Sequence, residues 1–122
     1  METENKKVYD LEERTYKFAN RVTDYVLKLP KTIPNIEYGH QVVRSSGSVG
    51  GNYIEANEGL GTKDFDLHIK ISRKEAKESR HWLRLTRPSP EQEVEKHLLI
   101  KESEELIRIF SSMINKRRNK NF

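Results

Sequence analysis

The sequence has no cysteine, and this absence excludes several kinds of site at once. The chain can form no disulfide framework, no thiolate metal site and no cysteine nucleophile. Four prolines and six glycines are too few for a disordered or fibrous chain. No apolar run approaches the ~20 residues of a membrane span, and the polar start at 1–7 lacks the apolar segment of a signal peptide. We therefore expect a soluble, cytoplasmic protein with one domain over residues 1–122.

Apolar residues are scarce, and charged residues are correspondingly frequent. Each class makes up 34% of the chain, whereas charged residues average about 25% in globular proteins. A core built from so few apolar side chains requires that they be well placed, and helices place them most economically. The net charge of +4 permits an anionic partner without requiring one.

Four segments show the period of an amphipathic helix, and proline or glycine separates them. The predicted helices cover about 10–29, 35–58, 62–86 and 90–116, and a basic tail follows at 116–122. No stretch alternates apolar and polar residues as a half-buried strand would. Four long helices joined by short loops predict an all-α, antiparallel up-down-up-down four-helix bundle.

Helix start signals accompany three of these segments. Asp10 with Glu13 is similar to a capping box, Thr62 is the expected N-cap of the third segment, and Ser89 with Gln92 forms a second capping box. For the fourth segment, the predicted inner face consists of Val94, Leu98, Leu99, Leu106, Ile109, Phe110 and Met113.

Three glycines lie inside the second predicted helix. Gly47, Gly50 and Gly51 each cost about 1 kcal/mol in a helix interior, so they need a structural reason. The preferred reason is the close approach of another helix. The alternative is a partly irregular segment.

The third segment carries two apolar stripes, although a peripheral helix of a monomeric bundle needs one. The first stripe would face the core. The second would face a neighbouring subunit, so the chain is expected to be a homo-oligomer. This predicted interface consists of Leu67, Ile71, Trp82 and Leu85.

Basic residues form a row on the third segment, at spacings of 3, 4, 3 and 4 from Lys70 to Arg84. Such a row could neutralise several phosphates of a nucleic acid. No aromatic residue is interleaved in the row to stack a base, so the expected contact is with the backbone. The alternative is a solvated face balanced by Asp66, Glu75 and Glu78. The candidate nucleic-acid-binding residues are Lys70, Arg73, Lys74, Lys77, Arg80, Arg84, Lys116, Arg117 and Arg118.

Two Glu-x-x-His motifs suggest a di-iron site, but their helical phase argues against one. Glu37 and His40 point away from the apolar stripe of the second segment, and Glu78 and His81 point away from that of the third. We therefore predict no metal and no other cofactor.

A polar row follows the second segment, and its members are Arg44, Ser48, Asn52 and Glu55. Their i,i+4 spacing predicts a structural ladder of hydrogen bonds and ion pairs, which a subunit interface could include. The alternative is catalysis by a positioned carboxylate, amide and arginine. No triad, P-loop or dinucleotide motif supports it, and we predict no catalytic residue.

The stretch QVVRSSGSVGGNYIEA at 41–56 resembles the signature of a small bacterial family of four helix bundle proteins, also called the 23S rRNA-intervening-sequence protein family (S23 type). Gly47 and Gly51 depart from that signature, which more often has Thr or Ser and Ala there. The resemblance extends over about residues 11–114. The matching residues are Arg44, Ser45, Ser48, Asn52 and Glu55 on the second segment, and Phe65, Glu75, Glu78 and Trp82 on the third.

The resemblance implies an antiparallel four-helix bundle that forms a homopentamer with a central channel and has no enzymatic activity. A more distant similarity is to the accessory variability determinant proteins of diversity-generating retroelements, basic pentamers that bind nucleic acid and a reverse transcriptase. The leading hypothesis is a non-enzymatic oligomer that binds the RNA or DNA backbone. The alternative is a protein-binding scaffold without nucleic-acid contact.

Overall fold

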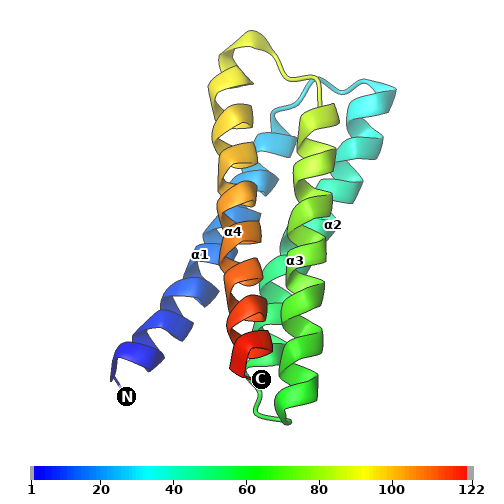
Figure 1. The fold of residues 1–122 in the computed structure, drawn as a ribbon. Helices are drawn as coiled ribbons and strands as arrows, with labels where there is room; N and C mark the ends of the chain where they lie inside the picture. Colours follow the sequence, from blue (N-terminus) through cyan, green and yellow to red (C-terminus); the bar gives the residue numbers. More distant parts are fainter. Residues whose placement is uncertain (1, 121–122) are drawn as a thin grey trace.

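Four long helices pack side by side in alternating directions (Figure 1). The computed structural model describes residues 2–120, and it describes side chains from Asp10 to Arg118. The elements are α1 (Glu2–Leu27), α2 (Ile33–Ala56), α3 (Thr62–Leu85), the short 3-10 turn η1 (Pro90–Gln92) and α4 (Glu93–Lys120). The described residues include no strand, so the predicted all-α bundle is confirmed. None of the described helices is long and apolar enough to cross a membrane.

The four helices do not contribute equally to the bundle. α2 and α3 share the most extensive contact, α3 and α4 the next, and α1 and α4 a small one. Figure 1 shows α1 diverging from the other helices toward its N-terminal end. The α2–α3 pair is therefore the centre of the molecule, and α1 and α4 pack onto it.

The first two helices have ends that differ from the prediction. α1 begins at Glu2 rather than at about residue 10, so the expected capping box at Asp10 is wrong. Residues 2–9 contain no proline or glycine, and nothing there interrupts the helix. α2 begins at Ile33 with Thr32 as its N-cap, whose Oγ1 accepts a hydrogen bond from the Asn35 amide at 3.3 Å. Its first turn includes a proline, which needs no hydrogen-bond partner there.

The starts of α3 and α4 also depart from the expected caps. The N-cap of α3 is Gly61, at φ 113°, rather than Thr62. Ser89 makes no capping bond to the main chain, and α4 is preceded by η1. The Ser89 hydroxyl instead bonds Gln92 Oε1 at 3.3 Å, and Gln92 Nε2 donates to the Tyr25 carbonyl at 3.0 Å. Gln92 thus ties the start of α4 to the end of α1.

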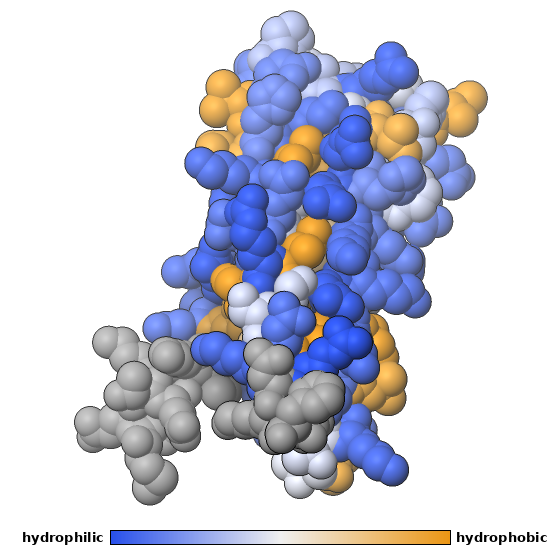
Figure 2. Space-filling view, viewed as in Figure 1, coloured by the Kyte–Doolittle hydropathy of each residue, from blue (hydrophilic) through white to orange (hydrophobic). Residues whose placement is uncertain are grey.

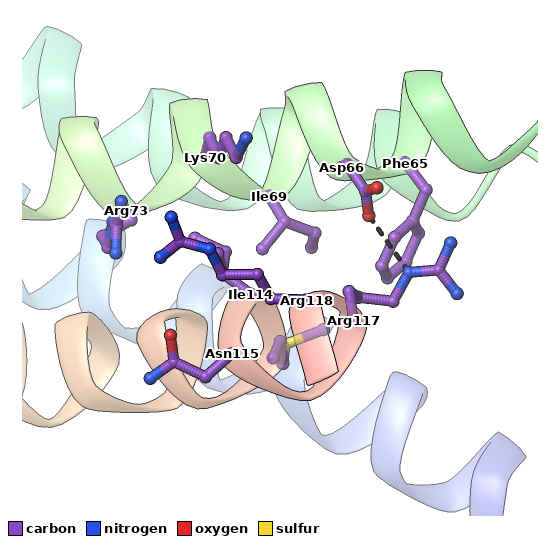
Figure 3. A pocket seen from close by; sticks show the side chains of 10 residues that line it. Phe65, Asp66, Ile69, Lys70, Arg73, Ile114, Asn115, Arg117 and Arg118 are labelled. Carbon is purple, nitrogen blue, oxygen red and sulfur yellow. Dashed lines mark hydrogen bonds and ion pairs between the residues drawn. The ribbon is translucent and has the colours of Figure 1, made fainter. Parts of the chain in front are cut away.

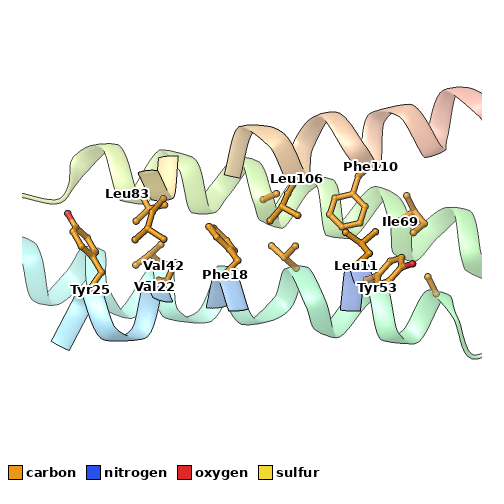
Figure 4. Close-up of a cluster of buried hydrophobic side chains, with 14 of the residues drawn as sticks. Leu11, Phe18, Val22, Tyr25, Val42, Tyr53, Ile69, Leu83, Leu106 and Phe110 are labelled. Carbon is orange, nitrogen blue, oxygen red and sulfur yellow. The ribbon is translucent and has the colours of Figure 1, made fainter. Parts of the chain in front are cut away.

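The core runs along the bundle axis and receives side chains from all four helices (Figure 4). Its fully buried members include Phe18, Val22, Val42, Val49, Ile69, Leu83, Leu99, Leu106 and Phe110. Val94 and Leu98 were expected on the inner face but are 70% and 48% exposed. The buried stripe of α4 instead includes Ser103, whose hydroxyl bonds the Ile100 carbonyl. The predicted face is confirmed at Leu99, Leu106 and Phe110, which are fully buried, and it is wrong at the two positions nearest the start of α4.

The glycines of α2 have two different roles. α2 is a continuous helix, so the irregular alternative is wrong. A Cβ added at Gly50 would lie 2.8 Å from Thr15 Oγ1, and one at Gly39 would lie 2.9 Å from Val26 Cγ1, so α1 packs closely at both. A Cβ at Gly47 or Gly51 would meet nothing within 4 Å, and the predicted close approach is wrong at these two positions within the described chain.

We therefore expect opposite effects from two adjacent substitutions. Gly51→Ala should raise the free energy of unfolding by about 0.5–1 kcal/mol, because alanine loses less backbone entropy on folding. Gly50→Ala should lower it, because Thr15 is held by hydrogen bonds to the Leu11 and Glu12 carbonyls and cannot easily move away. Urea unfolding measures both. Destabilisation by Gly51→Ala would contradict the open surface assigned to that position.

Candidate nucleic-acid interface

The predicted basic row lies along the edge of α3 that borders α4. Arg80 Nη1 is 3.9 Å from Glu104 Oε2, and Arg73 Nη1 donates to Ser111 Oγ at 3.5 Å. Both partners belong to α4. The row therefore forms one side of a two-helix face, which we call the α3–α4 face.

Figure 2 shows hydrophilic side chains covering both helices of this face, with a narrow line of apolar side chains between them. Lys70, Lys77 and Arg84 are exposed on it. Lys74 is also exposed, at the outer edge of the row. Among the side chains from Asp10 to Arg118, these four and Arg118 form no ion pair, so their charges remain available to an external anion.

A cavity of about 420 Å³ lies at the end of this face, where α3 begins and α4 ends (Figure 3). It brings Arg117 and Arg118 of the predicted tail beside Lys70 and Arg73 of the row. Arg118 extends from α4 toward Arg73 in Figure 3. Lys116 is exposed but does not line the cavity. The structure therefore joins two sequence-distant basic segments into one surface.

The acidic residues that could balance the row mostly lie elsewhere. Asp66 does pair with Arg117, at 3.1 Å between Oδ1 and Nε. Glu75 and Glu78 instead face Arg44 of α2, each at 3.7 Å. Asp66 and Glu104 therefore pair with Arg117 and Arg80, as the alternative of a partly balanced, solvated face expects, and the other cations of the row form no ion pair within the described side chains.

The four predicted interface residues fall into two groups. Leu67 and Leu85 are 54% and 37% exposed. Ile71 and Trp82 are half-buried, and the Trp82 ring stacks on Tyr38 of α2 with centroids 6.1 Å apart. Trp82 thus contributes to packing within the chain, and the two leucines are the most exposed of the four side chains.

The predicted polar ladder is present in part and extends to α3. Ser48 Oγ donates to the Arg44 carbonyl at 3.0 Å, and Asn52 Nδ2 donates to the Ser48 carbonyl at 2.9 Å. In both i,i+4 contacts the acceptor is therefore a main-chain carbonyl and not a side chain. Asn52 Oδ1 also bonds His68 Nδ1 of α3 at 3.1 Å, whereas Glu55 is exposed. The ladder links α2 to α3.

The carboxyl group of Glu75 is almost completely buried. Its residue is 6% exposed, and burial is the main cause that raises its pKa above the ordinary 4.5. The hydrogen bond and charge of Glu78 raise the pKa further, and Arg44 opposes them. Glu75 lies on the α2 side of α3, so it acts in helix pairing rather than on the basic face.

The Glu-x-x-His motifs do not converge. Glu37, His40 and His81 are exposed, and within the described residues no three His, Asp or Glu side chains gather as metal ligands.

The sequence reasoning missed Phe65 and Asp66 as parts of the candidate site. Arg117 lies over the Phe65 ring, with its Cζ 5.6 Å from the centroid. A signal was available, because antiparallel neighbours of similar length place the end of one helix beside the start of the other.

Comparison with known proteins gives two similarities. The family model described as 23S rRNA-intervening sequence protein matches residues 7–116. A crystal structure of a protein of unknown function from the S23 ribosomal protein family of Bacteroides thetaiotaomicron is 26% identical, with a TM-score of 0.70. The match covers 89% of this chain and 98% of that chain. Comparison with curated proteins gives no match.

The raised pKa of Glu75 predicts a pH-dependent stability difference. The folded state holds the Glu75 proton more tightly than the unfolded chain, so the contribution of this group to stability falls as pH rises from below 4.5 through the raised pKa. The free energy of unfolding of the wild type minus that of Glu75→Gln should therefore decrease between about pH 3.5 and pH 7.5.

Urea unfolding at several pH values measures this difference. Glu55→Gln, which removes an exposed carboxylate from α2, controls for the loss of one charge. If the difference for Glu75→Gln increases with pH, the charge of Arg44 has a larger effect on the pKa of Glu75 than burial has.

Proposed function

The chain belongs to the 23S rRNA-intervening sequence protein family, and from this premise we propose that it is a non-enzymatic protein that binds the phosphate backbone of RNA or DNA along the α3–α4 face. The observation that carries the proposal is the meeting of the α3 row with Arg117 and Arg118. Cations from two segments on one surface are what a polyanion requires. In this proposal the residues contribute positive charge that attracts phosphates, and they catalyse no reaction.

The dimensions of the row fit a nucleic acid backbone. From Lys70 to Arg84 it spans about 21 Å, at 1.5 Å of rise per residue. Duplex DNA carries one negative charge per about 1.7 Å of its axis, so several phosphates lie within that length. Exposed lysines and arginines contact phosphates without reading base edges. We therefore expect binding with little sequence preference and a strong salt dependence.

Charge reversal at the exposed part of the row tests the proposal. The double variant Lys70→Glu and Lys77→Glu should bind a labelled RNA hairpin and a labelled DNA duplex at least ten-fold more weakly at ~50 mM salt. The plot of log affinity against log salt should lose roughly 1.4–1.8 units of slope, at about 0.7–0.9 for each of the two phosphate contacts removed. Fluorescence anisotropy measures both quantities.

The double variant Lys17→Glu and Lys28→Glu is the matched control, because it changes the net charge equally at exposed positions on α1 and just beyond its end, away from the α3–α4 face. If both double variants weaken binding equally, only the net charge of the protein matters and the location of the site is wrong. Absence of wild-type binding to both probes would refute the proposal.

We also propose that the chain is a homo-oligomer, with the exposed leucines of the second α3 stripe in the contact. The apolar side chains of Leu67 and Leu85 are exposed to water, and a partner subunit that covers them would lower the free energy of the assembly. Light scattering should give the wild type a mass above the monomer value of 14.4 kDa. The double variant Leu67→Lys and Leu85→Lys should shift the mass toward that value.

The control for this shift is Leu60→Lys with Val94→Lys, at positions that are 75% and 70% exposed on other parts of the surface. A monomeric wild type, or an oligomer that the Leu67 and Leu85 variant leaves intact, would contradict the contact.

The second candidate function is a protein-binding scaffold, and one surface feature favours it. A groove of about 500 Å³ lies between the end of α1 and the start of α2, and Leu27, Ile36 and Val43 expose apolar surface there. Binding of one protein partner that is insensitive to salt, with no nucleic-acid binding, would favour this function over the first.

A further inference from the structure

The cavity at the end of the α3–α4 face has two chemically distinct parts. Phe65, Ile69, Met113 and Ile114 give it an apolar wall. Lys70, Arg73, Arg117 and Arg118 give it a cationic rim. Ile69 is a core residue, and Phe65, Met113 and Ile114 pack against the core while staying only partly buried. A simple phosphate-binding surface would need the rim alone, and the exposed part of these side chains adds an apolar surface beside it.

The size of the cavity indicates what the wall could contact. Its volume of about 420 Å³ lies in the range of pockets that hold small organic ligands, about 300–1,000 Å³. A ligand that satisfies both parts carries a flat apolar group next to an anion. A nucleotide has this composition, with a base that stacks and a phosphate that pairs with cations.

One planar group in the cavity suits the face of a base. The Arg117 guanidinium covers one side of the half-buried Phe65 ring, with its Cζ 5.6 Å from the centroid, so the side of the guanidinium that faces away from the ring is the surface on which a base can stack. Asp66 holds the Arg117 guanidinium by a 3.1 Å hydrogen bond, so this plane is oriented before any ligand arrives. Unpaired bases stack on aromatic rings and on arginine planes.

The cavity is continuous with the row. Lys70 and Arg73 belong to both, so a backbone that follows the row toward the start of α3 reaches the cavity mouth. A paired base cannot enter, because it is stacked and hydrogen-bonded within its helix. We propose that the cavity receives the base of an unpaired nucleotide, and that the protein therefore prefers a nucleic acid helix with a bulged nucleotide to an uninterrupted one. This inference rests on the proposed function of the α3–α4 face.

The experiment compares three duplexes of one sequence, each prepared as RNA and as DNA. The first is uninterrupted, the second carries one bulged pyrimidine nucleotide, and the third carries an abasic nucleotide in the same bulge. Anisotropy at ~100 mM salt should give the bulged duplex about ten-fold higher affinity than the uninterrupted one, from stacking of one base. The abasic bulge should lose that gain, which separates stacking from the flexibility of a bulged backbone.

Substitution of the ring supplies a second test. Phe65→Leu keeps an apolar side chain but removes the ring on which the Arg117 guanidinium rests, so it should abolish the preference for the bulge and leave affinity for the uninterrupted duplex unchanged. Tyr16→Leu, at a residue that is 65% exposed on α1, is the control and should leave the preference intact. Circular dichroism establishes that the variants are folded.

The outcomes separate the inference from the proposed function. Equal affinity for all three duplexes, weakened by the Lys70 and Lys77 double variant, would overturn the base site and leave backbone binding in place. A bulge preference that survives the abasic probe or Phe65→Leu would also overturn the base site. Absence of binding to every probe would overturn both.

Discussion

A seam of buried hydroxyl groups fixes how α2 and α3 pack, and the other features of the molecule depend on this contact. Ser45 Oγ and Ser79 Oγ lie 2.9 Å apart, and Ser72 Oγ donates to the Val49 carbonyl at 2.9 Å. Serine is small enough to let its hydroxyl reach the main chain of the neighbouring helix. Ser45 and Ser79 also bond carbonyls of their own helices, whereas the Ser72 hydroxyl bonds across to α2. A shift of one helix along the other would leave the Ser72 hydroxyl without this partner, and a buried hydroxyl without a partner costs about 1–3 kcal/mol. Within the described residues no buried side-chain polar atom lacks a partner.

This pairing separates charge across α3. One side of the helix faces α2, and there Glu75 and Glu78 lie near Arg44. The other side borders α4, and there the basic row is exposed with Arg73 and Arg80 at its inner edge. Glu75 is buried and Glu78 half-buried beside Arg44, so both lie on the side of α3 away from α4, and Lys74 at the outer edge of the row is near enough to lower the pKa of Glu75. The same seam that orders the core therefore shapes the face to which we assign nucleic-acid binding.

The sequence was sufficient for the architecture, because helical periodicity reports directly which side of each helix is buried. The sequence was less informative about where each helix begins, because several neighbouring residues could each serve as the N-cap. Nothing near Asp10 stops α1 from extending back to Glu2, and Gly61 replaces Thr62 as the cap because glycine accepts φ 113°. The predicted inner face of α4 was confirmed farther along the helix and was wrong at Val94 and Leu98, the two positions nearest its start.

The candidate site was predictable in its charges but not in its shape. Periodicity identified the row from Lys70 to Arg84 because those residues share one face of one helix. The cavity depends on how far α4 extends past the start of α3, and no local pattern encodes that register. Thus the sequence identified Phe65 as a residue shared with the family, and its contact with Arg117 emerged from the three-dimensional arrangement.

The central claim is that nucleic acid binds along the α3–α4 face, and lysine footprinting tests its location most directly. The protein would be acetylated briefly with and without a saturating RNA hairpin, and modification at each lysine would be quantified by mass spectrometry. The account predicts protection of Lys70, Lys74 and Lys77, with Lys17 and Lys28 unchanged. Uniform modification at all five lysines, or protection confined to Lys17 and Lys28, would contradict it.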